Sequence, residues 1–155
     1  MTERPAGIVS HLVVNDGVAA IDFYKKAFGA EEIARHAAED GKRLMHAELR
    51  IGSGVIYLCD DFPEMCGGKS RTPKALGGTP ITLHQNVRDV DAAIKRCADA
   101  GAKVTMPAAD MFWGDRYGLI KCPFGHNWAF ATHIKDMTPD EMMEASKEAF
   151  AGASA

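Results

Sequence analysis

Two segments of the chain place apolar residues at the three- and four-residue spacing of an amphipathic helix. One segment begins at Asp16 and stops at Gly29, and the other begins at Asp89 and stops at Gly101. An aspartate at the N-cap accepts a hydrogen bond from the first turn, and glycine after the last turn favours the left-handed conformation that ends a helix. The predicted helices are 16–28, with Val18, Ile21, Tyr24 and Phe28 on its apolar face, and 89–100, with Val90, Ala93, Ile94 and Cys97.

These helices belong to a repeat of the whole chain. Residues 14–21 and 87–94 share the pattern V-x-D-x-x-A-A-I, and each half contains one β-like run before its helix and three after it. The sequence therefore predicts an α+β fold of two βαβββ modules, about 6–61 and 79–134, in a single domain spanning 1–155. The predicted strands are 7–14, 31–38, 43–51 and 54–60 in the first module, and 80–87, 103–107, 116–122 and 126–133 in the second.

A third helix is predicted near the end of the chain, over about 138–150. It begins with the letters TPDE, a capping box that has proline in the first turn. This helix is partly apolar, so it either covers a sheet or packs on a partner chain. Its apolar residues are Met142, Met143, Ala149 and Phe150.

Composition and charge exclude several classes of protein. Hydrophobic residues make up 46% and charged residues 25% of the 155 positions, which is ordinary for a globular domain. The net charge of -3 gives no electrostatic reason to bind nucleic acid. No apolar run is long enough for a membrane span, and the start lacks the layout of a signal peptide. We expect a cytoplasmic protein whose four cysteines, without C-x-x-C spacing, are reduced thiols.

Several motifs resemble the vicinal oxygen chelate superfamily, which includes glyoxalase I, extradiol dioxygenases, and bleomycin-resistance and fosfomycin-modifying proteins. They are IDFYKKAFGAE, HAELRIGSGVIYLCDDFPE, MFWGDRYG and CPFGHNW, and the last three are most similar to the PhnB-like branch. The resemblance covers residues 6–135. It implies that the two modules form a curved, mixed sheet around a cavity, and that the protein is a homodimer. It does not imply one reaction, because this scaffold carries several.

Metal-dependent members of the superfamily take one metal ligand from the first strand and one from the last strand of each module. The corresponding residues here are Val9 and Tyr57 in the first module, and Thr82 and Ala129 in the second. Valine and alanine carry no donor atom, and threonine and neutral tyrosine are poor ligands for zinc or nickel. We therefore expect no metal cofactor at these positions.

Two histidines stand near the first-strand positions. His11 lies two residues after Val9, and His84 two residues after Thr82, so each shares a strand face with its neighbour. A shift of two residues in the alignment would make the histidines the first-strand ligands, and a divalent metal held by this pair stays an alternative. Otherwise they are hydrogen-bonded residues that line the cavity.

Other polar groups are candidates for a binding site. Trp113, Asp115 and Arg116 gather in the loop MFWGDRYG, which is either an aromatic receptor for a carboxylate or polar ring, or a plain hairpin turn. His46 and Glu48 share one strand face, where they are either a base with its partner or solvated side chains.

The function that these features favour is small-molecule binding in the cavity by a glyoxalase-like protein that lacks the usual metal ligands. The alternatives are a metal-dependent lyase or isomerase of glyoxalase type, and a resistance protein that sequesters a drug. The predicted ligand-binding residues are His11, Tyr57, Thr82, His84, Trp113, Asp115 and Arg116.

Overall fold

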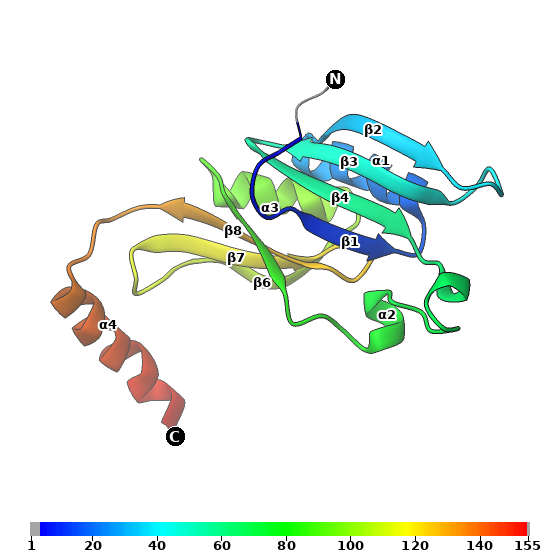
Figure 1. Ribbon diagram of the computed structural model, residues 1–155. Coiled ribbons are helices and arrows are strands. Elements are labelled where there is room, and N and C mark those ends of the chain that lie inside the picture. The colour runs from blue at the N-terminus through cyan, green and yellow to red at the C-terminus, as the bar shows by residue number, and fades with distance from the viewer. Residues whose placement is uncertain (1–3, 155) are drawn as a thin grey trace.

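The computed structural model describes residues 4–154 and contains two modules of the same design (Figure 1). The first module consists of β1 (Ser10–Val14), α1 (Gly17–Phe28), β2 (Glu31–Ala37), β3 (Leu44–Ile51) and β4 (Gly54–Asp60). The second consists of β5 (Thr82–Asn86), α3 (Val90–Asp99), β6 (Lys103–Asp110), β7 (Asp115–Lys121) and β8 (Asn127–His133). Between them lie η1 (Pro63–Met65) and α2 (Pro73–Leu76), and after them α4 (Pro139–Ala151) and η2 (Gly152–Ser154).

Each module forms its own four-stranded sheet. The strand orders are β1-β4-β3-β2 and β5-β8-β7-β6, with the first strand of each module parallel to the last and the other pairs antiparallel. The predicted α+β fold of two βαβββ modules is confirmed, and its mixed strands lie in two sheets.

The helices begin where the sequence predicts. The Asp16 carboxylate accepts a hydrogen bond from the Ala19 amide at 3.0 Å, and Asp89 does the same for Ala92 at 3.0 Å. Gly29 ends α1 in the left-handed conformation, with φ of 66°. One predicted core position is wrong, because Val18 is 39% exposed. Ala20, Phe23 and Ala27 join the buried face of α1 instead.

The two largest differences from the predicted strand boundaries are at the start of β1 and the end of β6. Strand β1 begins at Ser10 rather than residue 7, and Ile8 lies fully in solvent. Strand β6 continues past residue 107 to Asp110, although proline cannot donate to a ladder. Because β6 is an edge strand, and its pairing with β7 shifts between Met106 and Ala109, Pro107 needs no partner there.

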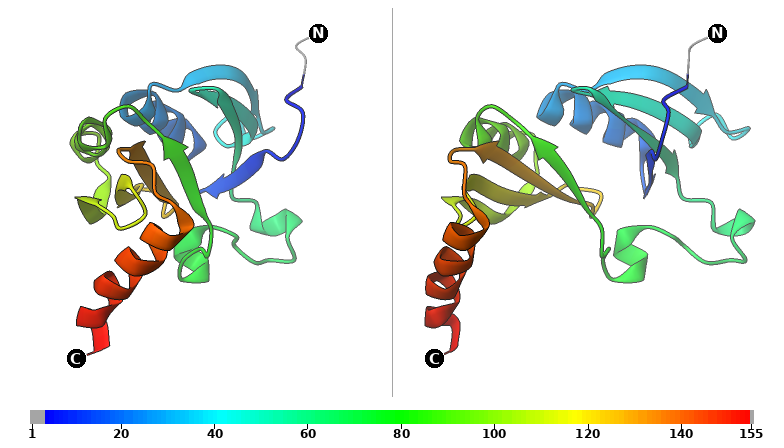
Figure 2. Two further views of the ribbon diagram at one scale, coloured as in Figure 1. Left: turned by 90° about the vertical axis from the view of Figure 1, so that its left-hand side faces the viewer. Right: turned by 60° about the vertical axis from the view of Figure 1, so that its left-hand side comes forward.

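The modules pack together through their helices. The Phe28 ring of α1 lies 4.5 Å from the Trp128 ring and 5.8 Å from the Phe130 ring of β8. The Arg96 side chain of α3 donates from Nε to the Lys26 carbonyl at 2.7 Å. Figure 2 shows both helices in the angle between the two sheets, so the helix-free face of each sheet points outward, in a different direction from the other.

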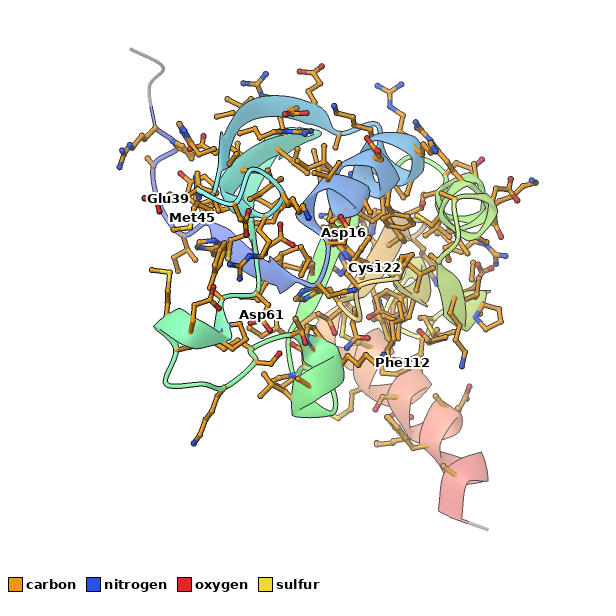
Figure 3. All side chains as sticks on the ribbon, turned by 90° about the vertical axis from the view of Figure 1, so that its right-hand side faces the viewer. Asp16, Glu39, Met45, Asp61, Phe112 and Cys122 are labelled. Carbon is orange, nitrogen blue, oxygen red and sulfur yellow. The ribbon has the colours of Figure 1, made fainter. Side chains whose placement is uncertain are left out.

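Helix α4 forms as predicted and extends away from the modules (Figure 1). Both hydrogen bonds of the capping box between Thr138 and Glu141 are present, but the helix buries no residue. Its Phe150 ring lies 5.9 Å from Phe112, which Figure 3 shows beside the helix. Within residues 4–154, no helix combines the length and apolar character needed to cross a membrane.

Candidate functional site

The helix-free face of the first sheet gathers imidazole, phenol and carboxylate groups. Leu12, Leu49 and Leu58 are buried toward α1, and alternation turns their neighbours to the opposite face. Strand register aligns these neighbours across four strands: His11 lies opposite Tyr57, Tyr57 opposite Glu48, and His36 opposite His46. We call His11, His46, Glu48 and Tyr57 the first-sheet cluster.

The members of the first-sheet cluster lie close enough to share a ligand. The His46 ring is 4.8 Å from the Tyr57 ring and 5.7 Å from the His11 ring, and in both cases the rings meet edge to face. His46 Nε2 lies 3.2 Å from Glu48 Oε1, which orients the imidazole. His11 and Tyr57 are also neighbours, with ring centroids 6.0 Å apart.

Electrostatics keep His11 neutral. Burial of the ring lowers its pKa below the usual value, and the nearby His46 and Arg71 lower it further. Burial also raises the pKa of the Cys59 thiol on β4, against the opposing effect of Arg71. At neutral pH this face therefore offers an uncharged imidazole and an uncharged thiol beside the Glu48 carboxylate.

The helix-free face of the second sheet carries a smaller polar group. His84 Nε2 lies 3.1 Å from Asn86 Oδ1, and the His84 ring is 6.1 Å from the Tyr117 ring. Trp113 lies next to Tyr117, at 5.6 Å, while Thr82 stands exposed at the start of β5. Thr82, His84, Trp113 and Tyr117 form the second-sheet cluster.

Asp115 is held between two side chains at the start of β7. It accepts a hydrogen bond from Trp113 Nε1 at 3.1 Å, and its other oxygen lies 2.9 Å from His133 Nδ1. His133 Nε2 in turn lies 2.8 Å from Asp136. Hydrogen bonding to Asp115 first, and then to Asp136, raises the pKa of His133 above its usual value.

Arg116 does not join the other predicted binding residues. Its guanidinium donates to both carboxylate oxygens of Asp91 on α3, at 2.7 and 2.9 Å, and to Asp110 at 2.9 Å. It precedes Tyr117 in β7, so alternation turns it to the helix side of the sheet. This placement does not support the predicted role of Arg116 in ligand binding, which stays a prediction.

The structure thus divides the predicted site between two faces. His11 and Tyr57 lie together on the first sheet, whereas Thr82, His84 and Trp113 lie on the second.

The sequence identified His46 and Glu48 only as residues sharing a strand face, and it did not single out His36 or Arg71. Alternating polar letters in MHAEL were the available signal for the first pair. The position of Arg71 depends on the path of the connector, which leaves no periodic pattern.

Strand register also tests the metal positions that the resemblance implies. Val9 precedes β1, and the in-register pairs are His11 with Tyr57 and His84 with Ala129. At the last-strand positions this chain has a phenol, Tyr57, and a methyl group, Ala129, whereas the metal-dependent members have a carboxylate ligand there. In the described chain, no three or more histidine, cysteine, aspartate and glutamate side chains are arranged to hold a metal ion.

Comparison with known proteins agrees with the architecture. The family model "Glyoxalase/Bleomycin resistance protein/Dioxygenase superfamily" matches residues 7–130. The uncharacterized protein Rv0887c of Mycobacterium tuberculosis is 51% identical over 135 residues, covering 87% of this chain and 79% of its own. The uncharacterized protein At5g48480 of Arabidopsis thaliana is 31% identical over 134 residues, covering 81% and 76%.

Solved structures show the same fold. The crystal structure of TioX from Micromonospora sp. ML1 superimposes with a TM-score of 0.62 at 28% identity, covering 86% of this chain and 100% of that one. The X-ray structure of the Arabidopsis protein gives a TM-score of 0.65 at 28% identity, covering 83% and 99%. By its match to the family model and to these relatives, the chain belongs to the glyoxalase/bleomycin resistance protein/dioxygenase superfamily.

Proposed function

We propose that this protein binds a small organic molecule on the first-sheet cluster. The observation that carries the proposal is the set of two imidazoles, a phenol and a carboxylate within one contact network on a sheet face that no helix covers. Such a face combines flat rings for stacking with a few hydrogen-bonding groups that fix orientation. Neutral His11 and the His46–Glu48 pair suit an uncharged polar ring better than a multiply charged ligand.

A second copy of the chain completes the site in this proposal. Each sheet leaves one face without a helix, and these two faces are turned in different directions (Figure 2). In a homodimer with twofold symmetry, the first-sheet cluster of one copy can lie opposite the second-sheet cluster of the other. His84, Thr82, Trp113 and Asp115 would then approach the ligand from the partner.

The remaining parts of the proposal rest on sequence features. The motifs MFWGDRYG and CPFGHNW support the PhnB-like branch, and the four free cysteines suit the reducing environment of the cytoplasm. Tyr57 and Ala129 at the last-strand positions support binding without a divalent metal. The ligand itself is then held by hydrogen bonds and stacking rather than by coordination.

The experiment is native mass spectrometry of the protein purified without chelator, combined with metal analysis and sedimentation equilibrium. We expect a dimer with a retained organic ligand, which is lost in the double variant His46→Ala/Tyr57→Phe and kept in Asp99→Ala, whose side chain pairs with Lys95 on an exposed surface. Ligand retention by the double variant would place the site elsewhere. One metal ion per chain, lost on Tyr57→Phe, would instead assign a metal-dependent enzyme of glyoxalase type.

A further inference from the structure

A separate hollow lies between strand β1 and the connector that joins the modules. Its volume is about 460 Å³, which is in the range of small-molecule pockets. Connector residues 71–81, including α2, form one wall, while β1 and Leu83 of β5 form the other. Figure 1 shows α2 below β1, where the connector turns back toward the second module.

The connector wall of the hollow is fixed in place. The Thr72 hydroxyl caps α2 by accepting a hydrogen bond from the Ala75 amide at 3.3 Å, and Thr72 and Pro73 are both buried. Gly125, in the turn before β8, lies so close to Pro73 that a Cβ atom at position 125 would be 2.8 Å from the Pro73 Cβ. The hollow is therefore a preformed feature held by the second module.

Most of the lining is apolar, and several of its large side chains are exposed to solvent. Leu76 is 67% exposed and Ile81 64% exposed, and Ile8 stands at the same rim. Large aliphatic side chains around one hollow are an unfavourable surface in water unless something covers them. Their removal from water would provide the hydrophobic part of the binding energy for a ligand.

One positive charge stands in this apolar lining. The charge belongs to Arg71. The backbone amide of Arg71 donates to Asp61 Oδ1 at 3.1 Å, which fixes the Arg71 backbone beside Asp61 (labelled in Figure 3). Arg35, Arg43 and Arg116 each hold carboxylates, but the Arg71 guanidinium forms no ion pair with any described residue.

The two histidines in the lining carry no competing charge. Burial lowers the pKa of His126, whose Nε2 lies 2.9 Å from the Val13 carbonyl and donates to it. His11 is neutral at pH 7 for the reasons given above. A single guanidinium among neutral groups matches a ligand with one negative charge, and its forked donors fit a carboxylate.

We propose that this hollow binds an aliphatic or aryl carboxylate, with the carboxylate on Arg71 and the apolar body against Leu76, Ile81 and Leu83. The site differs from the first-sheet cluster, with which it shares only His11. It does not require the proposed function, since a separate charge and separate walls recognise the ligand.

Isothermal titration calorimetry with dodecanoate at pH 7.5, below its critical micelle concentration, tests the site. We expect saturable binding of one molecule per chain to the full-length protein, and weaker binding of dodecanol. Arg71→Gln should weaken dodecanoate binding about tenfold or more, because a charge-assisted hydrogen bond pair is lost. Arg88→Gln is the matched control, since Arg88 is also exposed and lies outside the hollow. Arg71→Lys keeps the positive charge but loses the paired donors of the guanidinium, so its affinity for dodecanoate should lie between those of Arg71→Gln and Arg88→Gln.

Two further readouts separate this site from the other surfaces. Dodecanoate should raise the pKa of His11 in NMR titrations of wild type, because the carboxylate offsets Arg71. The double variant His46→Ala/Tyr57→Phe should still bind dodecanoate, whatever it does to the ligand of the first-sheet cluster. Equal affinities of Arg71→Gln and Arg88→Gln would overturn the proposal. A second result would also overturn it: wild type does not bind dodecanoate, and Leu76→Glu converts a dimer to monomers. A second copy of the chain would then cover the hollow.

Discussion

Asp60 shows how one buried side chain orders several elements. It ends β4 and is only 5% exposed, and its two carboxylate oxygens accept hydrogen bonds from the Gly17 amide at 2.9 Å and the Leu44 amide at 2.7 Å. These amides begin α1 and β3. The fit is so close that a Cβ atom at position 17 would lie 2.6 Å from Asp60 Oδ2, which explains the glycine there.

At this scale we predict that Asp60→Ala lowers the free energy of unfolding by about 3 kcal/mol, because two buried amides lose their acceptor. Urea denaturation followed by circular dichroism measures the change. Asp99→Ala is the control: its carboxylate pairs with Lys95 on an exposed helix surface, so the loss should stay below about 0.5 kcal/mol. Equal losses in the two variants would contradict the role given to Asp60.

At the scale of elements, strand alternation decided which predicted residues could meet. His11 and His84 were both placed from a period of two, and both lie on helix-free faces. The same period separates Arg116 from Tyr117 in β7, which begins within one residue of the predicted strand 116–122. The loop MFWGDRYG was nevertheless treated as one cluster, although neighbouring residues of a strand face opposite sides of the sheet.

The same hairpin supplies a pH prediction. His133, at the end of β8, bridges Asp115 on β7 and Asp136 on the segment before α4. Both ring nitrogens must donate in this bridge, so the protonated ring is favoured and the pKa of His133 is raised. The bridge should be complete below the unfolded pKa of about 6.5, and its stabilisation should be lost as pH rises through the raised folded value.

NMR titration of the histidine rings checks this prediction. His133 should titrate above 6.5, and Asp115→Asn should lower its pKa more than Asp136→Asn does. His126 is the internal comparison, because burial lowers its pKa and it should titrate below the usual value. A His133 pKa unmoved by both replacements would show that the bridge does not persist in solution.

At the scale of the whole molecule, the repeat predicted the modules but not their arrangement. V-x-D-x-x-A-A-I located both helices, because capping and helical spacing are local. The contacts that set the angle between the sheets join residues 70 or more positions apart. The sequence identifies Phe28 and Trp128 only as apolar residues, and no local pattern predicts that their rings are in contact. For this reason the candidate site was predicted as one set, although its residues lie on two faces.

The last prediction tests this junction between modules. Trp128 is buried, and its ring lies 4.5 Å from Phe28 and 5.5 Å from Tyr24, so α1 and β8 share one core. Trp128→Ala should lower the free energy of unfolding by about 3–5 kcal/mol, because it removes a large buried ring at the junction. Trp113→Ala, which removes a partly exposed tryptophan, should cost much less. If helix packing couples the modules, wild type should unfold in one urea transition, and Trp128→Ala should broaden or divide it. A junction variant that keeps the wild-type midpoint would show that each module is stable without the other.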